Sequence, residues 1–86
     1  MDDDLRLDSI IVNNIFVITN DYLTVKSTSL KIKAITIHDI LGRIISNKKN
    51  VNSNEISFGN IQKSNTTLLL RIELDNGTII NKKVNF

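Results

Sequence analysis

The sequence has no cysteine, proline or tryptophan among its 86 residues, and aromatic residues make up only 5% of it. The lack of cysteine excludes disulfides and thiolate metal sites, although it assigns no cellular compartment. No apolar run reaches the roughly 20 residues of a membrane-spanning helix. The net charge of +2 is not gathered into a basic segment with interleaved aromatics, so the sequence predicts no nucleic-acid partner.

The residues that are present favour β-structure. Isoleucine dominates the apolar residues, and β-branched side chains are frequent in strands. Short segments of alternating polarity are separated by turn signals at intervals of about 8–12 residues, and no segment keeps a helical period. The sequence therefore predicts an all-β fold, an antiparallel immunoglobulin-like β-sandwich of about seven strands.

We expect one domain with a short leader. Residues 1–8 are acidic and unpatterned, which predicts a flexible leader or linker remnant, and residues 9–86 form a single sandwich. Residues 15–18 are an unbroken apolar run, which predicts a strand covered on both faces or lying at a sheet corner. Phe16 and Phe58 are accordingly expected to be buried.

The clearest hairpin pattern spans residues 31–48. Ile35 and Ile37 alternate with polar residues before a turn that runs from Asp39 to Gly42. An aspartate at the first turn position can accept backbone N–H bonds, and a glycine at the last can adopt positive φ at no steric cost. Asp39 and Gly42 are therefore predicted to define the turn.

The tip of this hairpin leaves two alternatives open. Ile40 and Leu41 either fold back onto the core or form an exposed apolar knob for a partner. Gly42 and Arg43 are explained either by turn chemistry with a solvated arginine or by docking, because arginine can make bidentate contacts that lysine cannot.

A second hairpin closes the chain. Residues 66–74 place four apolar side chains on one face, and Asn76 and Gly77 predict the turn that follows. In the last strand, one register turns Ile80, Val84 and Phe86 inward and puts Lys82 on the core side at a sheet edge. The other register turns Ile79 and Lys83 inward.

The terminal lysines have two interpretations. Charges on an edge strand block edge-to-edge aggregation. Alternatively, Lys82 and Lys83 on a free edge are gripped by a partner through strand addition.

Catalytic chemistry is not predicted. His38 is the only histidine, and a single histidine cannot make a metal site. No serine lies in a nucleophile-elbow pattern, and so small a core leaves no room for a buried cleft. We therefore expect no enzyme activity, no metal and no cofactor.

Three segments resemble the C-terminal sorting domains of type IX (Por) secretion system cargo proteins of Bacteroidota. Residues 33–43 look like a strand ending in aspartate, two variable residues, glycine and arginine. Residues 50–58 are similar to the family's polar loop and short strand, and residues 68–84 to its terminal hairpin with a lysine pair. The sequence lacks a proline-asparagine-proline segment and has His38 where type A domains have tyrosine, so it looks more like type C.

The resemblance implies a non-catalytic export signal at the C-terminus of a longer chain, behind an N-terminal cargo domain. Its partners would be the outer-membrane translocon with its shuttle protein, and a surface sortase-like peptidase that cleaves in or before the leader. The cargo would cross the periplasm and reach the cell surface or medium. The candidates for partner recognition are Ile40, Leu41, Gly42, Arg43, Lys82 and Lys83. The alternative is a surface adhesion or carbohydrate-binding module, against which the scarcity of aromatics weighs.

Overall fold

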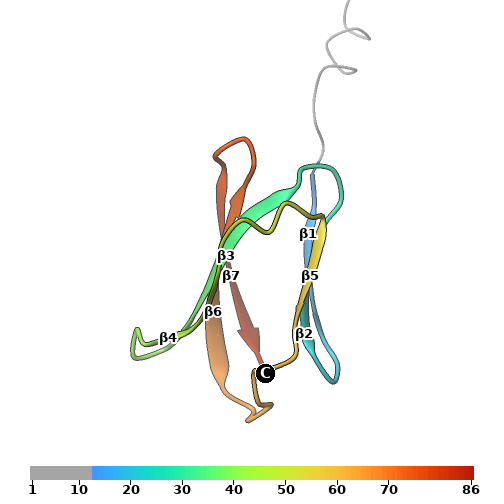
Figure 1. Ribbon diagram of the computed structural model, residues 1–86. Coiled ribbons are helices and arrows are strands. Elements are labelled where there is room, and N and C mark those ends of the chain that lie inside the picture. Colours follow the sequence, from blue (N-terminus) through green and yellow to red (C-terminus); the bar gives the residue numbers. More distant parts are fainter. Residues whose placement is uncertain (1–12) are drawn as a thin grey trace, which may run out of the picture.

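The computed structural model describes residues 13–86, which form seven strands and no helix. The strands are β1 (Ile15–Thr19), β2 (Leu23–Ser27), β3 (Ile32–Asp39), β4 (Ile44–Lys48), β5 (Glu55–Phe58), β6 (Thr67–Leu74) and β7 (Ile79–Asn85). They form two antiparallel sheets that lie face to face (Figure 1), in the orders β1-β2-β5 and β4-β3-β6-β7. The predicted immunoglobulin-like β-sandwich of seven strands is confirmed, whereas the expected leader, residues 1–8, lies outside the described residues.

Pairing between strands distant in sequence closes the sandwich. β2 pairs with β5 and β3 pairs with β6, so the chain crosses repeatedly between the two sheets in Greek-key fashion. β4 stays beside β3 as the returning strand of a hairpin. As a result, β4 and β7 are the edge strands of the larger sheet, and β1 and β5 those of the smaller one.

The core follows the period-2 alternation of the strands. β6 contributes every second residue, and Arg71 between them is exposed. Ile35 and Ile37 of β3 lie on the same side, and Leu23 and Phe58 face them from the smaller sheet. Burying each such side chain stabilises the fold by roughly 1.5–3 kcal/mol. The buried residues of β6 are Leu68, Leu70, Ile72 and Leu74.

The interpretation of residues 15–18 as a strand covered on both faces is wrong. Phe16 is 51% exposed, whereas Ile15 is buried and Val17 packs against the core. β1 is an edge strand that pairs with β2, and the exposure of Phe16 shows that its outer face is open to solvent. The expected burial of Phe16 therefore fails, while that of Phe58 is confirmed at 1% exposure.

The last strand adopts the register that turns Phe86 inward. Ile80 and Val84 are half-buried, and Phe86 is 2% exposed. Lys82 pairs with the buried Leu70 and so lies on the core side, but it stays exposed because β7 is an edge strand.

Phe86 also connects β7 to the loop before β6. Its backbone N–H donates to the Thr66 carbonyl (2.8 Å), and its backbone oxygen accepts from the N–H groups of Ser64 and Asn65. The Nζ of Lys63 lies 5.5 Å from the centre of its ring, within cation–π range. These contacts hold the β5–β6 connection against the end of the sandwich.

Candidate functional site

The β3–β4 turn is a three-residue loop. The Asp39 N–H donates to the Arg43 carbonyl, and the Gly42 N–H donates to the Asp39 carbonyl, both at 3.0 Å. Gly42 has φ +86°, the left-handed conformation that commonly ends such a loop. The second hairpin uses the same geometry between Leu74 and Thr78, with Gly77 at φ +89°.

Asp39 holds this turn with its side chain as well. Its Oδ1 accepts from the N–H groups of Leu41 and Arg43, both at 2.9 Å, and its Oδ2 accepts from the Arg43 Nε at 2.6 Å. Partial desolvation works against ionisation of the carboxyl group. The hydrogen bonds from Arg43 and Leu41 and the charge of Arg43 outweigh it, and they lower the pKa of Asp39.

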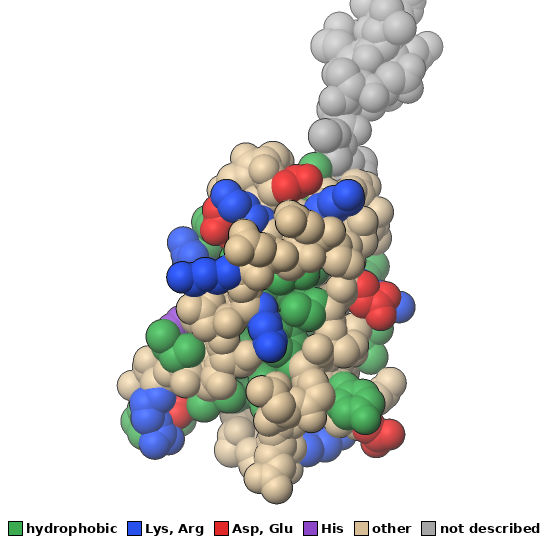
Figure 2. Space-filling view, viewed as in Figure 1, with side chains coloured by type: hydrophobic (Ala, Val, Ile, Leu, Met, Phe, Trp, Pro, Cys, Tyr) green, Lys and Arg blue, Asp and Glu red, His purple; other side chains and the backbone are tan. Residues whose placement is uncertain are grey.

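The hairpin tip is exposed. Ile40 is 71% and Leu41 is 74% exposed, so of the two alternatives the structure adopts the apolar knob and not the return to the core. The hairpin extends away from the smaller sheet (Figure 1), which leaves the tip without a covering layer. Figure 2 shows hydrophobic, basic and acidic side chains together at this corner of the molecule.

A groove of about 710 Å³ separates the hairpin from the β5–β6 connection. Its apolar lining continues the core outward to the hairpin tip, while Arg43 and the polar residues of the connection form its rim. The apolar lining residues are Ile40, Leu41, Ile45, Ile61 and Leu68.

A β-bulge directs Ile45 toward this groove. Ile37 pairs with Ser46 while His38 pairs with Ile44, so Ile45 is the additional residue of β4. Ile44 is 61% and Ile45 is 43% exposed. These two residues were missing from the predicted site, although two consecutive isoleucines in a short strand are a departure from alternation that could have indicated them.

The structure does not bring all the candidate residues together. Lys82 and Lys83 lie on β7, at the opposite edge of the sheet from β4. A smaller hollow of about 380 Å³ on that side is lined by both lysines, His38 and Leu69. The predicted recognition residues thus form two separate groups.

Asn76 and Gly77 lie at the far end of the same sheet. Asn76 Oδ1 accepts from the Thr78 N–H at 3.0 Å, which stabilises the second turn. Asp39 pairs with Leu68 at the beginning of β6, whereas this turn follows Leu74 at its end. The two glycine turns are therefore separated by the full length of β6.

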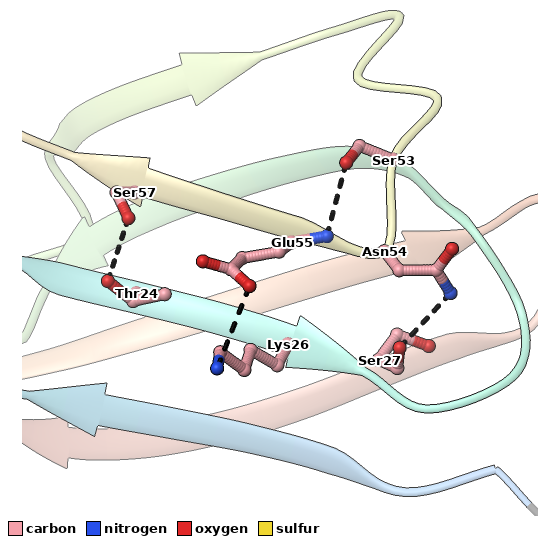
Figure 3. A network of polar contacts seen from close by, with 7 residues as sticks. All are labelled: Thr24, Lys26, Ser27, Ser53, Asn54, Glu55 and Ser57. Atoms are coloured by element: carbon pink, nitrogen blue, oxygen red, sulfur yellow. Dashed lines mark hydrogen bonds and ion pairs between the residues drawn. The ribbon is translucent and has the colours of Figure 1, made fainter.

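The smaller sheet has a polar network on β2 and β5 (Figure 3). Thr24 and Ser57 share a hydrogen bond of 2.8 Å, and the Lys26 Nζ lies 3.6 Å from a carboxylate oxygen of Glu55. Asn54 Nδ2 donates to the Ser27 carbonyl at 3.1 Å. Because these groups bond to one another, they bind the two strands together.

No grouping of three or more potential metal ligands occurs in residues 13–86. The part of the chain described by the structure also has no helix that is long and apolar enough to cross a membrane.

Fold and sequence together define the class: an all-β immunoglobulin-like sandwich of two antiparallel sheets. Residues 5–86 match the model of a family described as "Domain of unknown function (DUF8694)", and the chain belongs to that family. A search of curated proteins finds no match. The family description carries no activity, so function has to be argued from the site.

Proposed function

We propose that this domain is a non-catalytic C-terminal sorting signal that directs a cargo protein across the outer membrane through the type IX secretion system. The observation that carries the proposal is the hairpin tip. Ile40 and Leu41 are exposed on a turn that Asp39 holds in one conformation, within the segment that resembles the sorting domains.

Preorganisation makes this tip suitable for recognition. Three hydrogen bonds to Asp39 already hold the turn in one conformation. The turn therefore loses little further conformational entropy when a partner binds it. The Arg43 side chain is 74% exposed, and its Nε alone is committed to Asp39. The translocon or its shuttle protein would contact the apolar tip and the remaining donors of Arg43.

The other expected partners act on the parent chain. The cargo domain precedes this domain, and the sortase-like peptidase cleaves in or before residues 1–8. The domain itself folds in the periplasm and accompanies its cargo across the outer membrane, where cleavage separates the two and the cargo remains at the cell surface or enters the medium.

A carbohydrate-binding or adhesion module is the second candidate. Phe16 and Tyr22, both on the smaller sheet's side, are 51% and 57% exposed, and aromatic rings of this kind stack on sugars. The polar side chains of β2 and β5 are already bonded to one another, which leaves few free donors for sugar hydroxyls. Glycan-array binding that is lost in Phe16→Ala and Tyr22→Ala would favour this candidate.

The sorting proposal is tested with a periplasm-targeted fluorescent protein fused to the N-terminus of the chain. In a host with the translocon, we expect the reporter at the surface or in the medium. Removal of the translocon, or of β7 from the fusion, should leave it in the periplasm. A reporter that stays in the periplasm with the intact domain contradicts the proposal.

A further inference from the structure

We propose that the free edge of β4, with the groove beside it, binds an extended acidic peptide segment of a partner protein. The segment adds to the four-stranded sheet as a fifth strand. This inference concerns the binding chemistry of the edge and stands independently of the sorting proposal.

The edge of β4 has the exposure that strand addition requires. β4 pairs with β3 on one side, and no other described strand pairs with it. Ile44 and Ile45 are exposed beside the unpaired backbone, and the one core-facing charge of β4, Lys48 opposite the buried Ile35, lies at the end of the strand. Exposed apolar edges of this kind are templates for another strand.

The opposite edge of the sheet is protected. β7 has Lys82 at its centre on the core-facing side and Lys83 on the other, and an inward-pointing charge at the centre of an edge strand opposes strand addition more than Lys48 does at the end of β4. The two edges of one sheet therefore differ in a way that favours β4.

The groove supplies specificity. Side chains of an added strand alternate between the two faces of the sheet, so those on the inner face would stand over the groove. Ile45 belongs to both the strand and the groove lining, and Ile61 and Leu68 lie farther in. An apolar side chain from the partner can thus be buried next to the backbone pairing.

The charges around β4 select an acidic partner. Arg43 precedes the strand, and Lys48 and Lys49 end and follow it, all exposed. Neither lysine forms an ion pair within the described residues, and Asp39 is already held by Arg43. Five residues span about 17 Å, so acidic groups near both ends of a short peptide can reach these cations.

The same charges argue against a second copy of the chain as the occupant. Antiparallel self-pairing centred on Ser46 sets Arg43 opposite Lys49 of the second copy, and like charges directly opposite are destabilising. The bulge is confined to the Ile44–Ile45 end, so the pairing from Ser46 to Lys48 is regular.

The test is a selection of displayed random linear peptides on the immobilised 86-residue chain. We expect enriched peptides to carry acidic residues around an apolar, proline-free centre. Their binding should perturb the amide resonances of β4. Lys48→Glu with Lys49→Glu should weaken binding about tenfold or more, and Lys82→Glu with Lys83→Glu, the same charge change on the other edge, by less than about twofold.

A second pair of variants tests the groove. Ile45→Asp should abolish binding, and Ile79→Asp, an exposed isoleucine of β7, should leave it unchanged. Ile45→Ala replaces Ile45→Asp if circular dichroism shows a loss of fold. The proposal is overturned if no peptide is enriched, if the enriched peptides are basic, or if neither the lysine variants nor the Ile45 variant of β4 changes the peptide affinity. A concentration-dependent dimer that pairs through β4 also overturns it.

Discussion

At the residue scale, the hairpin depends on Asp39. Its carboxylate accepts three hydrogen bonds within the turn, two of them from Arg43, a candidate recognition residue. The second glycine turn has Leu74 at the corresponding position, so its geometry is maintained without this side chain. Asp39 is therefore a feature of the hairpin tip and not a general requirement of the turn type.

The lowered pKa of Asp39 makes its contribution dependent on pH. The stabilisation is present above the unfolded-state pKa of about 3.8 and is lost as the pH falls through the lower folded-state value. We expect Asp39→Asn to reduce the urea midpoint at neutral pH and to have progressively less effect below about pH 4. Asp75→Asn controls for loss of one negative charge. An effect of Asp39→Asn that is equal at neutral and acidic pH would contradict this prediction.

The positive φ of Gly42 predicts a second residue-scale effect. Gly42→Ala should destabilise the domain by about 1–2 kcal/mol, because an L-residue is strained in the left-handed conformation even though no atom lies near its Cβ. Gly59→Ala is the matched control, since its Cβ would make only an ordinary 3.7 Å contact with Tyr22. Urea unfolding measures both, and equal stabilities for the two variants would rule out the conformational explanation.

At the element scale, alternation was a good guide wherever a strand has one buried face. It placed Leu70 and Ile72 of β6 inward, but it left two registers open for β7, of which the structure adopts the one that turns Phe86 inward. Sequence reasoning failed for Phe16, because an unbroken apolar run does not indicate whether another layer of the protein covers the outer face of the strand. Nor did it predict the β4 bulge, since the extra residue Ile45 depends on how the three-residue turn joins two twisted strands.

Truncation of the Phe86 side chain at the end of β7 should cause a large loss of stability. Phe86→Ala should cost about 3–5 kcal/mol, because it empties a site that is 2% exposed next to the loop at Thr66. The identical change at Phe16, which is 51% exposed, should cost about 1 kcal/mol or less. Thermal or urea unfolding of both variants makes the comparison, and a similar loss for the two would contradict the register of β7.

At the scale of the whole molecule, the recognition candidates are spread over one sheet. The hairpin tip and β4 lie at one edge, and Lys82 and Lys83 at the other. With strands about 4.8 Å apart, the two edges are separated by about 14 Å. A partner that contacts both must cover the sheet, whereas one that adds to β4 needs only the hairpin side.

The small size of the domain limits its total stability, which makes core variants and surface variants behave differently. A domain of this length is expected to have about 5–10 kcal/mol of stability, so one core truncation can unfold a large part of the population. The exposed tip residues are different, because Ile40 and Leu41 contribute little buried area. Their substitution can separate recognition from folding.

The role of the hairpin tip in sorting is therefore tested by the export of a reporter fused to the triple variant Ile40→Ala, Leu41→Ala, Arg43→Ala, with unfolding of the same variant domain measured in parallel. The sorting account predicts that the variant keeps most of its stability and loses export to the surface or medium. The Phe16→Ala control should keep both. Export of the triple variant at the level of the intact domain, or a loss of export that is matched by a loss of folding, would contradict a recognition role for the hairpin tip.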